Sequence, residues 1–131
     1  MTSFKDLDAF QACHQLTLAA HRIGTKIGEH DRHLASRLQA AAVVAASRIA
    51  RGSGSRSSRV FSGCVDRTAC ALAEFAAYVE LARDLEFLPA DDHHELETLG
   101  GRALFYVSKL RVSLDPPAAT ETDPPPPIPS A

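Results

Sequence analysis

Arginines gather in the second quarter of the chain, around a segment rich in glycine and serine. Residues 32–65 hold six arginines and no acidic residue. Four of these arginines flank the Gly/Ser segment 52–58: Arg48, Arg51, Arg56 and Arg59. A guanidinium offers several fixed N–H donors to a phosphate, and the free N–H groups of a helix that starts after this segment would add to them. We predict an anion or phosphate site here, with Arg37 as a further contributor; a capped and solvated helix start is the alternative.

The patterns typical of catalysis are missing from the sequence. The Gly/Ser segment lacks the G-x-x-x-x-G-K-[ST] spacing of a P-loop, and no Glu-x-x-His pair, the usual ligand pattern of di-iron bundles, occurs anywhere. The serines cluster in one segment and the cysteines fall on apolar helix faces, so no nucleophile has an evident base. We therefore predict that the protein is not an enzyme and has no catalytic residue and no cofactor.

Six histidines could ligate a metal ion, but their spacing is not specific for one. They are His14, His21, His30, His33, His93 and His94. His93 and His94 follow two aspartates at the expected start of a helix, where polar residues are normally solvated. We predict exposed or half-buried imidazoles and no metal site.

The cysteines, the overall charge and the N-terminus suggest an ordinary intracellular protein. Cys13, Cys64 and Cys70 are odd in number and lack C-x-x-C spacing, so we expect small buried thiols in a reducing compartment. The net charge of −2 gives no reason by itself to expect nucleic acid, so any such case depends on the arginine cluster. No signal pattern and no apolar run near the roughly 20 residues of a membrane span occur. We predict a cytoplasmic protein that does not associate with membranes.

Four segments carry apolar residues at alternating steps of three and four, the period of an amphipathic helix. A content of 45% hydrophobic and only 6% aromatic residues also favours packed helices. The first helix is expected over residues 6–27. The second should run from an Asp31 cap to Gly52, and the third should follow a serine cap at the end of the Gly/Ser segment. The fourth should run from an Asp91 cap to about Leu114.

These stripes predict the core of an all-α, antiparallel, up-down four-helix bundle. The first two are Ala9, Cys13, Leu16, Ala20, Ile23 and Ile27, and Leu34, Leu38, Ala41, Ala42, Ala45 and Ile49. The other two are Phe61, Val65, Thr68, Leu72, Phe75, Val79 and Ala82, and Leu96, Leu99, Ala103, Val107, Leu110 and Leu114. Gly100 and Gly101 interrupt the last stripe, which predicts a tight helix crossing or a kink.

The C-terminal residues have a composition that cannot form a helix or a core. Residues 115–131 contain seven of the eight prolines and few apolar side chains. We predict one bundle domain over residues 1–114 and a disordered, partly polyproline tail over 115–131. Such a tail can bind a Pro-recognising groove on another protein, but a solvated terminus is the expectation.

Three motifs along the chain resemble those of one known bacterial family. The chain opens on Phe4-Lys5-Asp6-Leu7 and continues through Phe10 and His14, similar to the start of that family. Its middle, Ser47-Arg48-Ile49-Ala50-Arg51-Gly52-Ser53-Gly54, resembles the family pattern I-P-S-N-I-A-E-G-x-G. Leu72-Ala73-Glu74, Leu81-Ala82-Arg83-Asp84-Leu85 and Phe87-Leu88 resemble its last motif. That family is the four-helix-bundle proteins named for 23S ribosomal RNA intervening sequences, and the resemblance covers almost all of residues 4–114.

The resemblance implies a homo-oligomer, characteristically a pentamer, without catalytic residues. The family is also similar to the accessory protein of diversity-generating retroelements, which binds a reverse transcriptase and nucleic acid. This chain departs from the family pattern at Ala46 in place of proline, Arg48 in place of asparagine and Arg51 in place of glutamate. The two arginines raise the local positive charge where the family has polar or acidic residues.

Together these observations predict a homo-oligomeric bundle that binds RNA or DNA through the arginine cluster, and the resemblance implies a reverse transcriptase as the kind of protein partner. In a ring, each copy would repeat the cluster and strengthen binding. The alternative is a protein-interaction scaffold, in which the arginines pair with the acidic region 84–97 of a neighbouring subunit.

Overall fold

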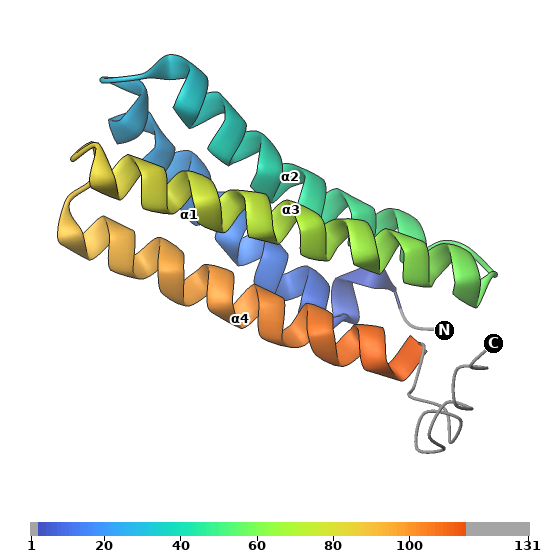
Figure 1. Cartoon of the computed structure of the whole chain (residues 1–131). Coiled ribbons are helices and arrows are strands. Elements are labelled where there is room, and N and C mark those ends of the chain that lie inside the picture. The colour runs from blue at the N-terminus through green and yellow to red at the C-terminus, as the bar shows by residue number, and fades with distance from the viewer. Residues whose placement is uncertain (1–2, 115–131) are drawn as a thin grey trace, which may run out of the picture.

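The helices run up and down in chain order, because the connections between them are short. A computed structural model describes residues 3–114. It contains a short 3-10 turn, η1 (Phe4–Asp6), and four helices: α1 (Asp8–Gly28), α2 (Arg32–Ser53), α3 (Ser58–Asp84) and α4 (Ala90–Leu114). Each helix packs on the next, and α4 closes the bundle against α1 (Figure 1). The predicted all-α, antiparallel four-helix bundle is confirmed, while the predicted disordered tail, residues 115–131, lies outside the described residues.

Side-chain caps start two helices where the sequence predicted them. The Asp31 carboxylate accepts the N–H of Leu34 at 3.0 Å, and the Ser57 hydroxyl accepts the N–H of Val60 at 3.2 Å. The predicted cap at Asp91 is wrong. Helix α4 begins one residue earlier, because the carbonyl of Pro89 takes the first helical N–H, that of His93, at 3.0 Å. Asp91 instead lies in the first turn, where its charge favours the helix dipole.

The predicted core is present, but it is less complete on the last helix. Every residue of the first two stripes is buried, and in the third stripe only Phe61 is partly exposed. In α4 three of the six predicted residues are only partly buried: Leu99, Leu110 and Leu114. The α4 side of the bundle is therefore the less tightly covered side.

Helices α1, α2 and α3 approach one another closely through small residues and two threonines. The Thr17 hydroxyl donates to the carbonyl of Ala42, and the Thr68 hydroxyl donates to the carbonyl of Ala45, both at 3.1 Å. Such bonds from one helix to the backbone of the next require short interhelical distances. At the end of α2, a Cβ atom on Gly52 would lie 2.7 Å from the Cβ of Cys64, so only glycine fits there.

The two glycines of α4 have a different effect from the one predicted. Helix α4 continues unbroken through both. A Cβ on Gly100 would meet the Phe75 ring at 3.9 Å, and a Cβ on Gly101 would meet no atom within 4 Å, so neither glycine serves a tight crossing. Instead they help to leave a groove of about 370 Å³ between α3 and α4, which we call the α3–α4 groove.

The cysteines and the membrane prediction have mixed outcomes. Cys13 and Cys64 are buried as predicted, and burial raises the pKa of the Cys13 thiol to about 12. Cys70 is exposed, so the prediction of a buried thiol is wrong there, because this position of α3 faces away from the other helices. Within residues 3–114, no helix has the length and apolar character to cross a membrane.

Replacing Gly52 by alanine should destabilise the protein, although alanine is the better helix former. The added methyl group overlaps the Cβ of Cys64, and overpacking of this kind typically costs about 1–3 kcal/mol. Gly63→Ala is the matched control, because a Cβ there meets nothing within 4 Å and should stabilise helix α3 by about 0.8–1 kcal/mol. Urea unfolding measures both changes. Equal stabilisation by the two substitutions would contradict the close approach of α2 and α3 at Gly52.

Thiol labelling of the native protein should distinguish the exposed Cys70 from the buried Cys13. Cys70 should react readily with iodoacetamide at pH 8, since its thiol is exposed. Cys13 should stay unmodified, because it is buried and its raised pKa leaves almost no thiolate at that pH. The folded state prefers the Cys13 thiol protonated, so this contribution to stability is complete below pH 9 and is lost as the pH rises towards about 12. Mass spectrometry of native and urea-unfolded samples reads out each site.

Candidate nucleic-acid interface

Three of the predicted arginines meet at the connection between α2 and α3. Arg51 lies in the last turn of α2, Arg56 in the connection and Arg59 in the first turn of α3, and all three are exposed. Arg48 lies one turn before Arg51 and is partly buried. The antiparallel turn thus gathers these four residues at one end of the bundle, which we call the arginine end (Figure 1).

Serine hydroxyls fix the shape of this connection. Ser53 donates to the carbonyl of Ala50 at 2.9 Å, and Ser55 accepts the N–H of Ser57 at 3.0 Å. Ser57 then caps α3. The backbone N–H groups of Ser58 and Arg59, in the first turn of α3, have no acceptor among residues 3–114. They remain available to an anion, which helix N-termini favour.

Arg37 lies apart from the other predicted site residues. It is exposed on α2, eleven residues before Arg48, which is about 16 Å along a helix. It lines a shallow depression together with Glu74 and Tyr78 of α3. The structure therefore does not bring Arg37 together with the arginine end.

The arginine end has positive charge that residues 3–114 do not neutralise. Within the described part of the chain, none of the five predicted arginines forms an ion pair. Asp66, two turns into α3, binds the Arg111 guanidinium of α4 at 2.7 Å instead. Among residues 3–114, no ion pair would have to break before these guanidinium groups bind an external anion.

The opposite end of the bundle is acidic. Residues 80–97, around the connection from α3 to α4, contain seven acidic residues and a single arginine. Four of these acids already pair with cations of the chain: Glu80, Asp84, Asp92 and Glu95. The up-down topology thus separates the two signs of charge between the two ends.

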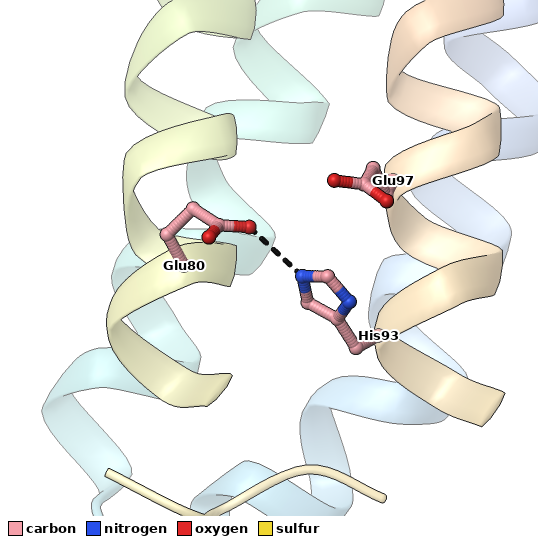
Figure 2. A group of neighbouring side chains, drawn as sticks. All are labelled: Glu80, His93 and Glu97. Atoms are coloured by element: carbon pink, nitrogen blue, oxygen red, sulfur yellow. Dashed lines mark hydrogen bonds and ion pairs between the residues drawn. The ribbon is translucent and has the colours of Figure 1, made fainter. Parts of the chain in front are cut away.

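At this acidic end, Glu80, His93 and Glu97 form a cluster that was not predicted from the sequence (Figure 2). His93 is only 8% exposed, and the Nε2 atom of its ring lies 2.8 Å from Oε2 of Glu80. The prediction of an exposed or half-buried imidazole is therefore wrong for His93. Its position on α4 turns the ring towards α3 and away from solvent. The spacing of His93 and Glu97, four residues apart on one helix face, was the available signal.

The neighbours of Glu80 favour its charged form. The hydrogen bond with His93 is the main cause, and the positive charge of Arg83 adds to it. Desolvation acts in the opposite direction. Together they hold the pKa of the Glu80 carboxyl below its ordinary value, so this side chain is a carboxylate at neutral pH.

Comparison with protein-family models gave no match, and comparison with curated proteins gave none. The resemblance to the bacterial intervening-sequence family therefore stays a prediction from the motifs.

Proposed function

We propose that this protein is a non-enzymatic, cytoplasmic, homo-oligomeric bundle that binds nucleic acid, preferably RNA, through its arginine end. The supporting observation is the group of four arginines at one end of the bundle, none of them neutralised by the described part of the chain. Guanidinium groups and free helix N–H groups suit phosphate oxygens. Because the contact is with phosphates, binding should depend strongly on salt and weakly on base sequence.

Exposed apolar residues support the oligomeric part of the proposal. Phe105 is 59% exposed, and Leu104 and Val112 on the same helix are also largely exposed. Phe105 and Val112 lie seven residues apart, so they share one outer stripe of α4. Apolar patches of this kind commonly mark protein contacts. A pentamer follows from the family resemblance alone, and such a ring would present five arginine ends to one nucleic-acid strand.

The same resemblance extends the proposal to a partner. A bacterial bundle that carries nucleic acid beside a reverse transcriptase would act as an accessory to a nucleoprotein, as the resembled accessory protein does. The arginine end would then contact the RNA, while another face of the bundle would contact the enzyme.

A protein scaffold is the second candidate, and the acidic end is the observation that favours it. Glu86, Asp91 and Glu97 are exposed and form no ion pair within residues 3–114. They could pair with the arginine end of another copy. Within residues 3–114, however, four of the seven acids are already paired, whereas none of the four clustered arginines is, so an external polyanion accounts for more of this unpaired charge.

Removing the arginine end should weaken RNA binding and reduce its salt dependence. The test variant replaces Arg48, Arg51, Arg56 and Arg59 by glutamine, which keeps the aliphatic packing of the side chains. Fluorescence anisotropy with a labelled single-stranded RNA at 50–300 mM salt should show at least about a tenfold loss of affinity. The slope of log K against log salt should fall by about 2–3, since each phosphate contact in a single strand contributes about 0.7.

The matched control replaces Arg32 and Arg37, two exposed arginines of α2 that also lack an ion-pair partner among residues 3–114. This double variant should retain nearly all of the affinity, because both residues lie away from the arginine end. Equal loss in the two variants would place the contact elsewhere. If neither the wild-type protein nor either variant binds RNA, and light scattering shows an assembly that dissociates in salt or on loss of the four arginines, the scaffold is correct.

A further inference from the structure

The Glu80, His93 and Glu97 side chains bring one imidazole and two carboxylates to a single point between α3 and α4. Their ligating atoms all lie within 4.8 Å of one another. Figure 2 shows Glu80 reaching across from α3 to the His93 ring, with Glu97 one turn further along α4. Ligands around a tetrahedral Zn²⁺ at about 2.0–2.2 Å lie about 3.4 Å from one another, so rotations of the two glutamate side chains would close the site.

Each of the three groups is suited to hold a cation. His93 is buried, so its ring position is set by packing. The Glu80 carboxylate is oriented from its other side, because its Oε1 binds Nη2 of Arg83 at 3.0 Å while its Oε2 faces His93. In metal sites, residues that do not touch the ion commonly hold the ligand oxygens in place by contacts of this kind. Glu97 is exposed and forms no ion pair within the described residues.

The charge of the cluster favours a cation over a structural ion pair alone. Arg83 is the cation paired with Glu80, and it also contacts Asp84 at 3.5 Å. Glu97 adds a second carboxylate close to Glu80 without adding a positive charge. Two neighbouring carboxylates repel each other unless a cation lies between them. A divalent cation bound by both carboxylates would relieve this repulsion.

The surroundings leave room for a further ligand of the ion. Glu80 and Glu97 both line the α3–α4 groove, whose other walls are mostly alanine, glycine and large apolar side chains. An ion held by three protein ligands at the end of this groove would keep one coordination position for water or for an oxygen of a small molecule, as open zinc sites do.

We propose that Glu80, His93 and Glu97 bind a divalent transition-metal ion, with Zn²⁺ as the best fit to one nitrogen and two oxygen ligands. His93 would coordinate through Nε2, and the ring proton would then reside on Nδ1. Arg83 would act as a positioning residue for the Glu80 carboxylate. The site does not depend on the proposed nucleic-acid function, since it lies at the opposite end of the bundle.

Isothermal titration of the chelator-treated full chain with Zn²⁺ tests the site. We expect one ion per chain at the site, and a loss of affinity on the order of 100-fold in both His93→Gln and Glu97→Gln. Because Glu97 is exposed, its variant should fold normally, which keeps the test decisive if the buried His93 variant does not fold. Cobalt(II) offers a second readout, because the intensity of its visible absorption reports whether a tetrahedral site forms.

His94→Ala and Asp91→Asn are the matched controls, because both residues are exposed on α4 beside the cluster but do not belong to it. They should retain wild-type affinity. Arg83→Gln should weaken binding by about 10-fold while keeping one ion per chain, as expected for a residue that acts through Glu80. Wild-type affinity in Glu97→Gln, or an equal loss in His94→Ala, would overturn the proposal and assign the binding to scattered surface histidines.

Discussion

The close approach of α1, α2 and α3 is the constraint on which the rest of the bundle depends. Many of the buried positions on α1 and α2 are alanine, and an alanine buries little area, so the backbones must come near each other for packing to stabilise the fold. The hydroxyls of Thr17 and Thr68 reach the neighbouring backbone only at this spacing. Gly52 extends the same spacing to the end of α2 and so fixes where the arginine end lies. Helices α3 and α4 also carry small residues where they face each other, but they do not approach as closely. The space between them is the α3–α4 groove.

The up-down topology turns local differences in charge composition into a separation of charge along the whole bundle. The connection from α2 to α3 is basic and the connection from α3 to α4 is acidic. In an up-down bundle these two connections lie at opposite ends, so the charges separate along the bundle axis (Figure 1). The N-terminus of α3 lies at the basic end, where its dipole adds to the attraction for anions. A small net charge of −2 therefore conceals a strongly polar charge distribution.

Much of the fold could be predicted from the sequence, because helical periodicity and capping are local properties. The four stripes and the caps at Asp31 and Ser57 required only neighbouring residues, and they are confirmed. The predicted cap at Asp91 was wrong, because the carbonyl of Pro89 accepts the first helical hydrogen bond there. The predicted burial of Cys70 was wrong, because a thiol is small enough to occupy an exposed position at little cost in free energy.

Local sequence patterns could not predict the contacts between helices. The spacing of His93 and Glu97 places them on one face of α4, but periodicity does not reveal that Glu80 lies opposite, because this depends on the register of α3 against α4. The register also decides that His93 is buried while His94 is exposed. The arginine end could be predicted because a short turn joins its members, whereas Arg37 belongs to the same acid-free segment yet lies far along α2.

The two proposed sites are carried by different helix pairs, and this has a physical consequence. Arg59 and Glu80 are 21 residues apart on α3, about 31 Å along the helix, which is several times the Debye length of about 8 Å at physiological salt. An ion bound at Glu80 would therefore add little potential at the arginine end. It would instead link α3 to α4, the two helices that the α3–α4 groove separates. The arginine end, by contrast, is held together by the α2–α3 contact around Gly52. Any coupling between the sites would have to pass through the packing of α3 rather than through charge.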